Sequence, residues 1–401
     1  MLRRVFKAFH YRDFRLLWIG ACTSSIGTWM QIVAQSWLVL SISGSARMLG
    51  LDAFLGQIPI LMFSLIGGVI ADRIDRRHVL LGSQYTQMTC AFVLALLIAL
   101  KLVKVWHILS MSFIVGCAQA FGGPAYQALV PMLVEKDDLP NAIALNSIQF
   151  NLARVIGPML GGFALTGLGA AWCFALNGVS FVAVIISLLL LHIRFIPKAT
   201  GDSILTGVKQ GIMFIRRQSA MVSLIGLAFC MTALAIPLIT FLPVFAKDVF
   251  HHGPTTFTIL LSCSGAGSVA GALAVAGLGN IQRKGMAALL MLILLGAGMA
   301  GFSLSKQLVL SGLLLFVSGA ALMGVFSMIS SLVQLITSNE MRGRVMSVYN
   351  VAFRGGMPLG SLATGWLVPI YTAPHVLAVN GLLLVAVSGY FLLIQRRVAA
   401  L

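Results

Sequence analysis

Three charged residues lie within long apolar segments of the sequence, where a charged side chain is unusual. Arg154 and Arg354 lie near the middle of their segments, and Asp52 lies about one helical turn from the start of another. An arginine at the centre of a membrane helix costs about 2.5–3.5 kcal/mol on insertion scales, so it rarely faces lipid. The arginines could hold an anionic substrate group or modulate a nearby acid. Alternatively, carbonyls and polar neighbours such as Asn151 and Asn350 could cap them.

Asp52 is the candidate for proton coupling. It is the only carboxylate within an apolar segment, and desolvation favours the protonated form of a carboxyl group. An ordinary acid in the first turn of a helix explains Asp52 equally well. None of the seven histidines lies convincingly in mid-segment, so we expect no histidine relay.

A stripe of hydrogen-bonding side chains runs along the apolar segment 14–42. Residues 24, 28, 31 and 35 share one face of a helix, and such a stripe in mid-membrane must face protein or a wet cavity. Together with polar residues of other segments it indicates a cavity for amphipathic molecules. Hydrogen bonding between helices is the alternative for some of them. The candidate cavity residues are Arg154, Arg354, Thr28, Gln31, Gln35, Gln57, Gln119, Asn146, Gln149 and Gln334.

The sequence contains no motif of an enzyme or a metal site. It lacks HExxH, G-x-S-x-G and the phosphate-binding G-x-x-x-x-G-K-[ST]. The six cysteines are scattered singly, without metal-ligand spacing. We therefore expect no catalytic residue, no bound metal and no cofactor, and we expect that the protein is not an enzyme.

The composition is that of a membrane protein. Of 401 residues, 59% are hydrophobic and 9% are charged, whereas soluble domains have about 25% charged residues. Segments long enough to cross a bilayer recur along the chain. The expected fold is all-α and polytopic, with twelve transmembrane helices near 14–42, 48–71, 79–101, 106–131, 141–166, 171–192, 219–246, 255–279, 285–304, 308–336, 343–367 and 374–395.

Basic residues set the orientation. Most of the 27 Lys and Arg lie at the N-terminus, after the even-numbered spans or close to the ends of spans on that side, and only Arg47, Lys101, Lys104, Lys247 and Lys306 lie in the connections of the other side. The positive-inside rule then predicts that both termini are cytoplasmic, in the inner (cytoplasmic) membrane. The net charge of +17 is confined to short loops, so it does not predict nucleic-acid binding.

The chain has two similar halves. LARVIGP at 152–158 and AFRGGMP at 352–358 place an Arg and a Pro 200 residues apart, and ALNG at 175–178 matches AVNG at 378–381. Because each half has an even number of spans, a pseudo-twofold axis along the membrane normal should relate them. We expect a six-helix half at 1–192, a cytoplasmic linker at 193–218 and a second six-helix half at 219–401.

Two motifs resemble those of the major facilitator superfamily. Gly68-Val-Ile-Ala-Asp72-Arg73-Ile-Asp75-Arg76-Arg77 is similar to its loop 2–3 signature, with Asp75 in place of the usual second glycine. Ala153-Arg-Val-Ile-Gly157-Pro158-Met-Leu-Gly161-Gly162 resembles its antiporter motif, with alanine for the first glycine. The run 124–162 is similar to the drug:proton antiporter branch, which includes enterobactin-exporter-like and macrolide-efflux-like proteins.

The resemblance implies a gate at the loop motif. Asp72 would lie near the positive start of the helix that begins near Gly343. The basic residues Arg73, Arg76 and Arg77 would pair with acids after the fourth span, forming a latch; these acids are Glu135, Asp137 and Asp138. Alternatively, the charges only set topology.

In the fifth span, four residues of the antiporter-like motif leave room for a second helix. Gly157, Gly161 and Gly162 remove side chains, and Pro158 permits a bend. In the family this feature is associated with export, although ordinary small-residue packing also explains it.

These observations predict a secondary transporter that exports an amphipathic small molecule by proton antiport with alternating access. A transporter or flippase for a lysophospholipid is the nearest alternative, and a non-transporting sensor or scaffold is a more remote one. The expected partners are the substrate, protons and the lipid bilayer, without nucleic acid, and we expect a monomer.

Overall fold

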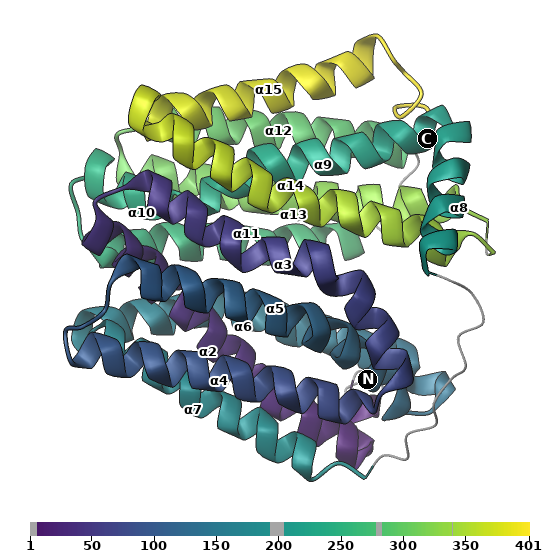
Figure 1. The fold of residues 1–401 in the computed structure, drawn as a ribbon. Helices are drawn as coiled ribbons and strands as arrows, with labels where there is room; N and C mark the ends of the chain where they lie inside the picture. The colour runs from purple at the N-terminus through teal and green to yellow at the C-terminus, as the bar shows by residue number, and fades with distance from the viewer. Residues whose placement is uncertain (1–5, 193–203, 278–282, 339) are drawn as a thin grey trace. The chain divides into compact units, whose positions relative to one another are not determined.

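The computed structural model describes residues 6–192, 204–277, 283–338 and 340–401, and these residues are almost entirely helical. Figure 1 labels the helices that follow. Their order is η1 (Lys7–His10), α2 (Arg12–Ser43), α3 (Ala46–Arg73), α4 (Arg76–Ala99), α5 (Val105–Leu129), η2 (Val130–Met132), η3 (Lys136–Asp138), α6 (Leu139–Gly167), α7 (Ala170–Leu189), α8 (Ile204–Arg217), α9 (Ser219–Thr240), α10 (Leu242–Val244), η4 (Phe245–Val249), α11 (Pro254–Gly277), α12 (Lys284–Leu304), α13 (Leu308–Leu335), α14 (Arg342–Tyr371) and α15 (Ala373–Leu393).

Twelve helices of the described residues have at least 20 residues, one for each expected span. Ten spans of the described residues are long and apolar enough to cross a membrane. The other two long helices, α6 and α14, carry Arg154 and Arg354. These arginines, with the polar residues around them, lower the mean hydropathy of both helices.

The expected span 219–246 is divided in the structure. The helix α9 ends at Thr240, α10 follows at Leu242, and a single π-helical turn, η4, covers Phe245–Val249. Pro243 has no N–H group to donate to the carbonyl four residues earlier, which accounts for the interruption of the regular helix at this point.

The chain forms two compact units. The first contains residues 1–43 and 55–201, and the second contains residues 44–54 and 202–401. The start of α3 thus groups with the second unit. Part of the segment expected as a linker is the helix α8, which in Figure 1 runs across the ends of α9 and α14. Gly211 of α8 packs against the main-chain carbonyl of Arg344 in α14.

The same neighbours recur within each unit, which supports the duplication indicated by the sequence. In the first unit α2 packs on α6 and α7, and α4 packs on α5 and α7. In the second unit α9 packs on α14 and α15, and α12 packs on α13 and α15. A glycine contact also recurs between corresponding pairs of helices. In the first unit Gly67 of α3 packs on the Ala120 carbonyl of α5, and in the second unit Gly271 of α11 packs on the Ala320 carbonyl of α13.

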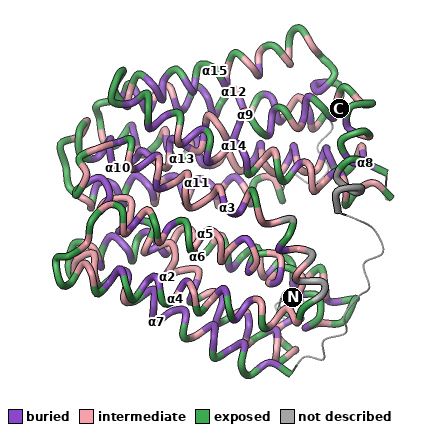
Figure 2. The backbone as a smooth tube through the Cα atoms, viewed as in Figure 1, coloured by how far each residue is buried: buried purple, intermediate pink, exposed green. Residues whose placement is uncertain are grey.

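The long helices are apolar on more than one side. Figure 2 shows buried, intermediate and exposed residues alternating along each of them. Many exposed positions hold large apolar side chains, such as Phe163, Leu313 and Leu382, which are 74%, 60% and 59% exposed. Side chains of this kind suit a hydrocarbon environment, so the exposed apolar faces fit contact with lipid.

Candidate cavity and gating residues

The polar stripe of α2 forms hydrogen bonds with neighbouring helices of the first unit. The Gln31 side-chain oxygen accepts a hydrogen bond from the Asn177 amide of α7 at 2.6 Å. The Gln35 amide donates to the Ser112 hydroxyl of α5 at 2.9 Å. Gln31 also donates to Gln35 at 3.4 Å. Four side chains thus form one chain of hydrogen bonds that links three helices.

Asn177 was not among the candidates predicted from the sequence. The repeated Asn-Gly of residues 175–178 and 378–381 was the available signal, and both of its asparagines are buried. In the second unit, Asn380 of α15 donates to the Thr364 hydroxyl of α14 at 3.4 Å. The repeated asparagine therefore joins the last helix of each unit to another helix of the same unit.

Other predicted cavity residues also have partners within the first unit. Gln149 of α6 is buried and donates to the Ser25 hydroxyl at 2.7 Å and the Ala21 carbonyl at 3.2 Å, both in α2. Asn146 accepts a hydrogen bond from the Tyr126 hydroxyl of α5 at 2.6 Å. These contacts are those expected of hydrogen bonding between helices.

The three remaining amides and Thr28 lie in different surroundings. Gln119 of α5 donates to the Gln87 oxygen of α4 at 3.3 Å, and Thr28 donates back to the Ser24 carbonyl within α2. Gln57 of α3 is half-buried. Gln334 is exposed, one residue before the end of α13.

Arg154 lies beside aromatic rings of the first unit. Its guanidinium carbon is 5.9 Å from the centre of the Trp29 ring in α2, within the range of a cation–π interaction. The Phe150 ring lies edge-on to Trp29 at 6.4 Å. The Asn151 amide nitrogen donates to the Ser147 carbonyl, and its buried oxygen has no hydrogen-bond partner among the described residues. Asn151 therefore does not cap the guanidinium.

Arg354 is the corresponding residue of the second unit, in α14. Its side chain is exposed, and the preceding residue, Phe353, packs against Phe326 at 4.9 Å and Tyr349 at 6.1 Å. Only for Arg154 does the structure record contact between the guanidinium and a ring, because the rings around Phe353 belong to the residue before Arg354 and adjacent residues of a helix point in different directions.

The antiporter-like motif packs α6 closely on α2. A side chain at Gly157 would meet Trp29, and one at Gly161 would lie 2.9 Å from the Met30 Cα. Gly162 and Pro158 are buried, and α6 continues past the proline to Gly167. In the second unit Gly356 and Gly360 of α14 pack in the same way on residues 229–233 of α9. Close helix packing is therefore common to both units.

The loop motif between α3 and α4 has local roles in the structure. The Asp75 carboxylate caps the start of α4 by accepting a hydrogen bond from the Arg77 main-chain N–H at 2.9 Å, and it pairs with His78 at 3.1 Å. A carboxylate at this position satisfies a free N–H group of the first helical turn. Gly68 has open space around it. The side chains of Asp72 and Arg73 lie outside the described part of the structure.

The arginines of the motif contact main-chain carbonyls. Arg76 donates to the Ala128 carbonyl at the end of α5 at 2.9 Å, and Arg77 donates to the Leu189 carbonyl at the end of α7 at 2.6 Å. The carbonyls at the end of a helix carry partial negative charge and lack partners within the helix. Both contacts therefore hold α4 to neighbouring helix ends.

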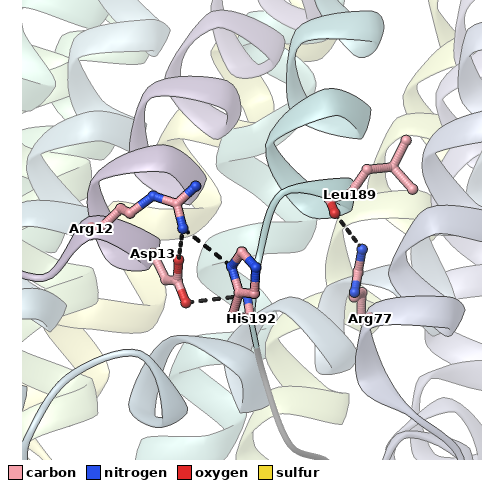
Figure 3. Close-up of polar contacts among 5 residues, drawn as sticks. All are labelled: Arg12, Asp13, Arg77, Leu189 and His192. Atoms are coloured by element: carbon pink, nitrogen blue, oxygen red, sulfur yellow. Dashed lines mark hydrogen bonds and ion pairs between the residues drawn. The ribbon is translucent and has the colours of Figure 1, made fainter.

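Figure 3 shows the end of α7, where the described part of the first unit ends. Arg77 meets Leu189 on one side. On the other side the His192 ring lies 3.1 Å from Arg12, and its main-chain N–H donates to the Asp13 carboxylate at 3.2 Å. The starts of α2 and α4 thus both hold the segment that leads to the second unit.

Asp138, expected to pair with the motif arginines, binds the N-terminal segment instead. Its carboxylate pairs with Lys7 at 2.7 Å and accepts a hydrogen bond from the Tyr11 hydroxyl at 2.9 Å. The hydrogen bond from Lys7 holds the pKa of the Asp138 carboxyl below its usual value, and the same contact raises the pKa of Lys7. Burial raises the pKa of Tyr11, and its hydrogen bond to Asp138 adds to this rise.

The start of α3 packs on α14 within the second unit. A side chain at Gly50 would lie 2.6 Å from the Ser361 carbonyl and 3.0 Å from the Gly365 Cα. Three residues earlier, the Arg47 guanidinium carbon lies 5.0 Å from the centre of the Trp366 ring. Asp52 follows in the same segment and is buried, at 8% exposure.

Comparisons with known proteins agree with this architecture. The family model described as transmembrane secretion effector matches residues 5–400. The macrolide efflux protein A of Streptococcus pyogenes is 23% identical, and the match covers 94% of each chain. The enterobactin exporter EntS of Escherichia coli is 26% identical, covering 96% of this chain and 92% of the relative. The crystal structure of a mutant of the nucleoside transporter NupG has the same fold, with a TM-score of 0.78 and 16% identity, and the match covers 95% of this chain and 99% of that one.

Proposed function

Because the chain belongs to the transmembrane secretion effectors of the major facilitator superfamily, we propose that it exports an amphipathic small molecule in exchange for protons. Membership of this family makes it a multi-pass membrane transporter rather than an enzyme. The full-length similarity to a macrolide efflux protein and an enterobactin exporter is the observation that carries export. We place it in the cytoplasmic membrane, as a monomer with both termini in the cytoplasm.

Alternating access is supported by the contact at Gly50. The start of α3 meets α14 there through the small residues Gly50, Ser361 and Gly365, with the contact of Arg47 and Trp366 beside them. Small residues let helix backbones approach closely, and they leave a contact that depends mainly on packing. We propose that this contact forms and separates during each transport cycle.

Proton coupling is assigned to Asp52, which lies two residues beyond Gly50 and is buried in this structure. A carboxyl group that is buried when α3 packs on α14 and hydrated when they separate would bind a proton more readily in the buried state. Each charge that moves down a potential of 100 mV supplies about 2.3 kcal/mol, which corresponds to a roughly 40-fold concentration gradient. One coupled proton is therefore sufficient for useful export.

The cavity is assigned to residues of the candidate set that have spare bonding capacity. Arg154, Arg354 and Gln57 are the strongest members, because Gln31, Gln35 and Gln149 bind neighbouring helices. The bonded amides, with Thr28, Gln119 and Asn146, would line the cavity without being its main ligands. Gln334 would lie at its rim, near the end of α13.

The test is transport by the purified protein in liposomes, across a panel of a siderophore, a macrolide, a cationic dye and a lysolipid. We expect uptake into inverted vesicles that collapses when a protonophore is added. Continued pumping would contradict proton coupling, and transport of the lysolipid alone would favour the lipid-transporting alternative. Binding of a panel compound without transport would support a sensor.

The variant Asp52→Asn tests the assignment of the coupling residue. We expect it to lose the pH dependence of transport, because an amide cannot take up a proton in this range. Asp248→Asn is the matched control, since Asp248 is exposed in η4, and it should behave as the wild type. If Asp52→Asn keeps the wild-type pH profile, Asp52 is not the proton carrier.

A further inference from the structure

Each unit places one arginine in its fifth long helix without a carboxylate to balance it. Arg154 lies near the middle of α6 and Arg354 near the middle of α14. Among the described residues of its own unit, no carboxylate forms an ion pair with either arginine. An uncompensated guanidinium at such a depth attracts anions and repels cations.

The surroundings of Arg154 leave its hydrogen-bond donors available. Its guanidinium interacts with the Trp29 ring, and within the described first unit it donates no hydrogen bond. A guanidinium group has five N–H donors in a rigid fork that matches a carboxylate. An interaction with a ring uses none of these N–H groups as a conventional hydrogen-bond donor, so the site retains bonding capacity for a ligand.

Aromatic side chains lie next to the N–H donors of Arg154. Phe150 packs edge-on against Trp29 and is 53% exposed, so the cluster of Trp29, Phe150 and Arg154 is open on one side. Gly157 lets α6 approach α2 closely at Trp29, because a side chain at this position would meet the Trp29 Cβ. An aromatic ring of a ligand could pack on Phe150 while an attached anionic group reached Arg154.

The second unit has an arginine at the corresponding position of α14. Arg354 is exposed, and its neighbour Phe353 packs against Phe326 and Tyr349. The side chain of Arg354, like that of Arg154, forms no ion pair or hydrogen bond among the described residues of its unit. Two arginines at corresponding positions, neither paired with a carboxylate of the described residues of its own unit, indicate a preference in substrate charge.

We propose that Arg154 and Arg354 select anionic amphiphiles that carry an aromatic ring, with a carboxylate or phenolate as the anionic group, and exclude cationic ones. This inference rests on the proposed export function and narrows its substrate class. Charge selection follows because a cation at either arginine would meet a guanidinium that no carboxylate of the described residues of its own unit compensates. Compared with the anionic compound, a neutral compound of the same shape would lack only the charge-assisted hydrogen bonds to the arginine.

The test uses two fluorescent amphiphiles with one aromatic scaffold, one carrying a carboxylate and the other a quaternary ammonium group. Binding to the purified protein and transport by inverted vesicles are measured for both. We expect binding and transport of the carboxylate compound only. Arg154→Gln should weaken its binding about tenfold or more, since hydrogen bonds to charged groups are among the strongest, and Arg154→Lys should retain part of the affinity.

Charge reversal separates selection from a structural role. Arg154→Glu should lose the carboxylate compound and gain measurable binding of the ammonium compound, whereas replacement of a merely structural arginine would lose the carboxylate compound without any gain of the ammonium compound. Arg396→Gln is the control, because Arg396 is an exposed arginine outside the cluster whose side chain contacts a helix-end carbonyl, and like the wild type it should bind the carboxylate compound and not the ammonium compound.

The outcomes distinguish the inference from the export function. Export of the ammonium compound but not of the carboxylate compound would overturn the inference and leave the export function standing. Unchanged binding of the carboxylate compound by both Arg154→Gln and Arg354→Gln would also overturn it. If the wild type transports neither compound nor any member of the earlier panel, the export function itself is wrong, and the inference falls with it.

Discussion

At the scale of single residues, the structure divides the polar side chains of the spans into those with partners and those without. Gln31, Gln149 and Asn177 bind neighbouring helices, whereas Arg154 donates no hydrogen bond among the described residues of its unit. A buried amide without a partner is costly in lipid, so most amides in spans should pair within the bundle. The residues left with free bonding capacity are the better candidates for ligand contacts.

The hydrogen bond between Asn177 and Gln31 should contribute to stability. Asn177→Ala leaves the side-chain oxygen of the half-buried Gln31 without its 2.6 Å donor. Such bonds in membrane proteins contribute about 0.6 kcal/mol on average and up to about 1.7 kcal/mol, and we expect a loss in this range in the free energy of unfolding in detergent. Gln334→Ala, at an exposed position, is the control and should change little. Equal effects for the two variants would contradict this role.

The pair of Lys7 and Asp138 should make stability depend on pH in a defined direction. The pKa of Asp138 lies below its ordinary 3.8, so the stabilisation is present above that pH and is lost as the pH falls through the lower, folded value. The pKa of Lys7 lies above its ordinary 10.5, so the stabilisation is present below that pH and is lost as the pH rises through the higher value. Between about pH 4 and pH 10 it should be constant.

Thermal unfolding as a function of pH measures this pair. Asp138→Asn should lower the melting temperature at neutral pH and reduce the difference between neutral and acidic conditions. Asp137→Asn, which alters an exposed neighbour in the same short helix, should retain the wild-type profile. An unchanged melting temperature for Asp138→Asn across this range would show that the pair is not stabilising.

At the scale of helices, glycines determine how closely α6 approaches α2 and how closely α14 approaches α9. Gly157 and Gly161 meet α2, and Gly356 and Gly360 meet α9. The recurrence in both units shows that the antiporter-like motif serves close packing. Any role in export would come in addition to that packing, because the second unit uses the same device without the full motif.

Gly161→Ala tests this packing. The added methyl group would lie 2.9 Å from the Met30 Cα and 3.0 Å from its carbonyl oxygen, and main-chain atoms cannot move aside easily. Overpacking of this kind costs about 1–3 kcal/mol, which should appear as reduced thermal stability. Gly167→Ala in the same helix is the control, since no other group lies within 4 Å of its added methyl. A stable Gly161→Ala variant would show that α2 and α6 can separate.

At the scale of the whole molecule, α3 belongs to both compact units. Its first residues group with the second unit and its remainder with the first. Gly50, which contacts Gly365 of the second unit, therefore lies on a helix whose later residues belong to the first unit. A change at this contact would be transmitted along α3, which is the property that alternating access requires.

Cross-linking tests whether this contact must separate during transport. In a background without the six native cysteines, Arg47→Cys with Trp366→Cys places two thiols at positions whose side chains are in contact in this structure, so that oxidation, or a short reducible cross-linker, can join α3 to α14 there. We expect oxidation to stop transport and reduction to restore it. Each single cysteine variant should transport under both conditions. Full transport by the oxidised double variant would show that the contact stays closed.

The sequence by itself determined the helices, their number and the duplication of the chain. Apolar length and loop charge are local properties, and the repeated residues around Arg154 and Arg354 identify corresponding helices without any contact being known. Only the tertiary structure decided the partners: Asn177 for Gln31, Lys7 for Asp138, and the first turn of α4 for Asp75. These pairings join residues that depend on which helices are neighbours and on the side each one presents, and local sequence patterns do not contain that information.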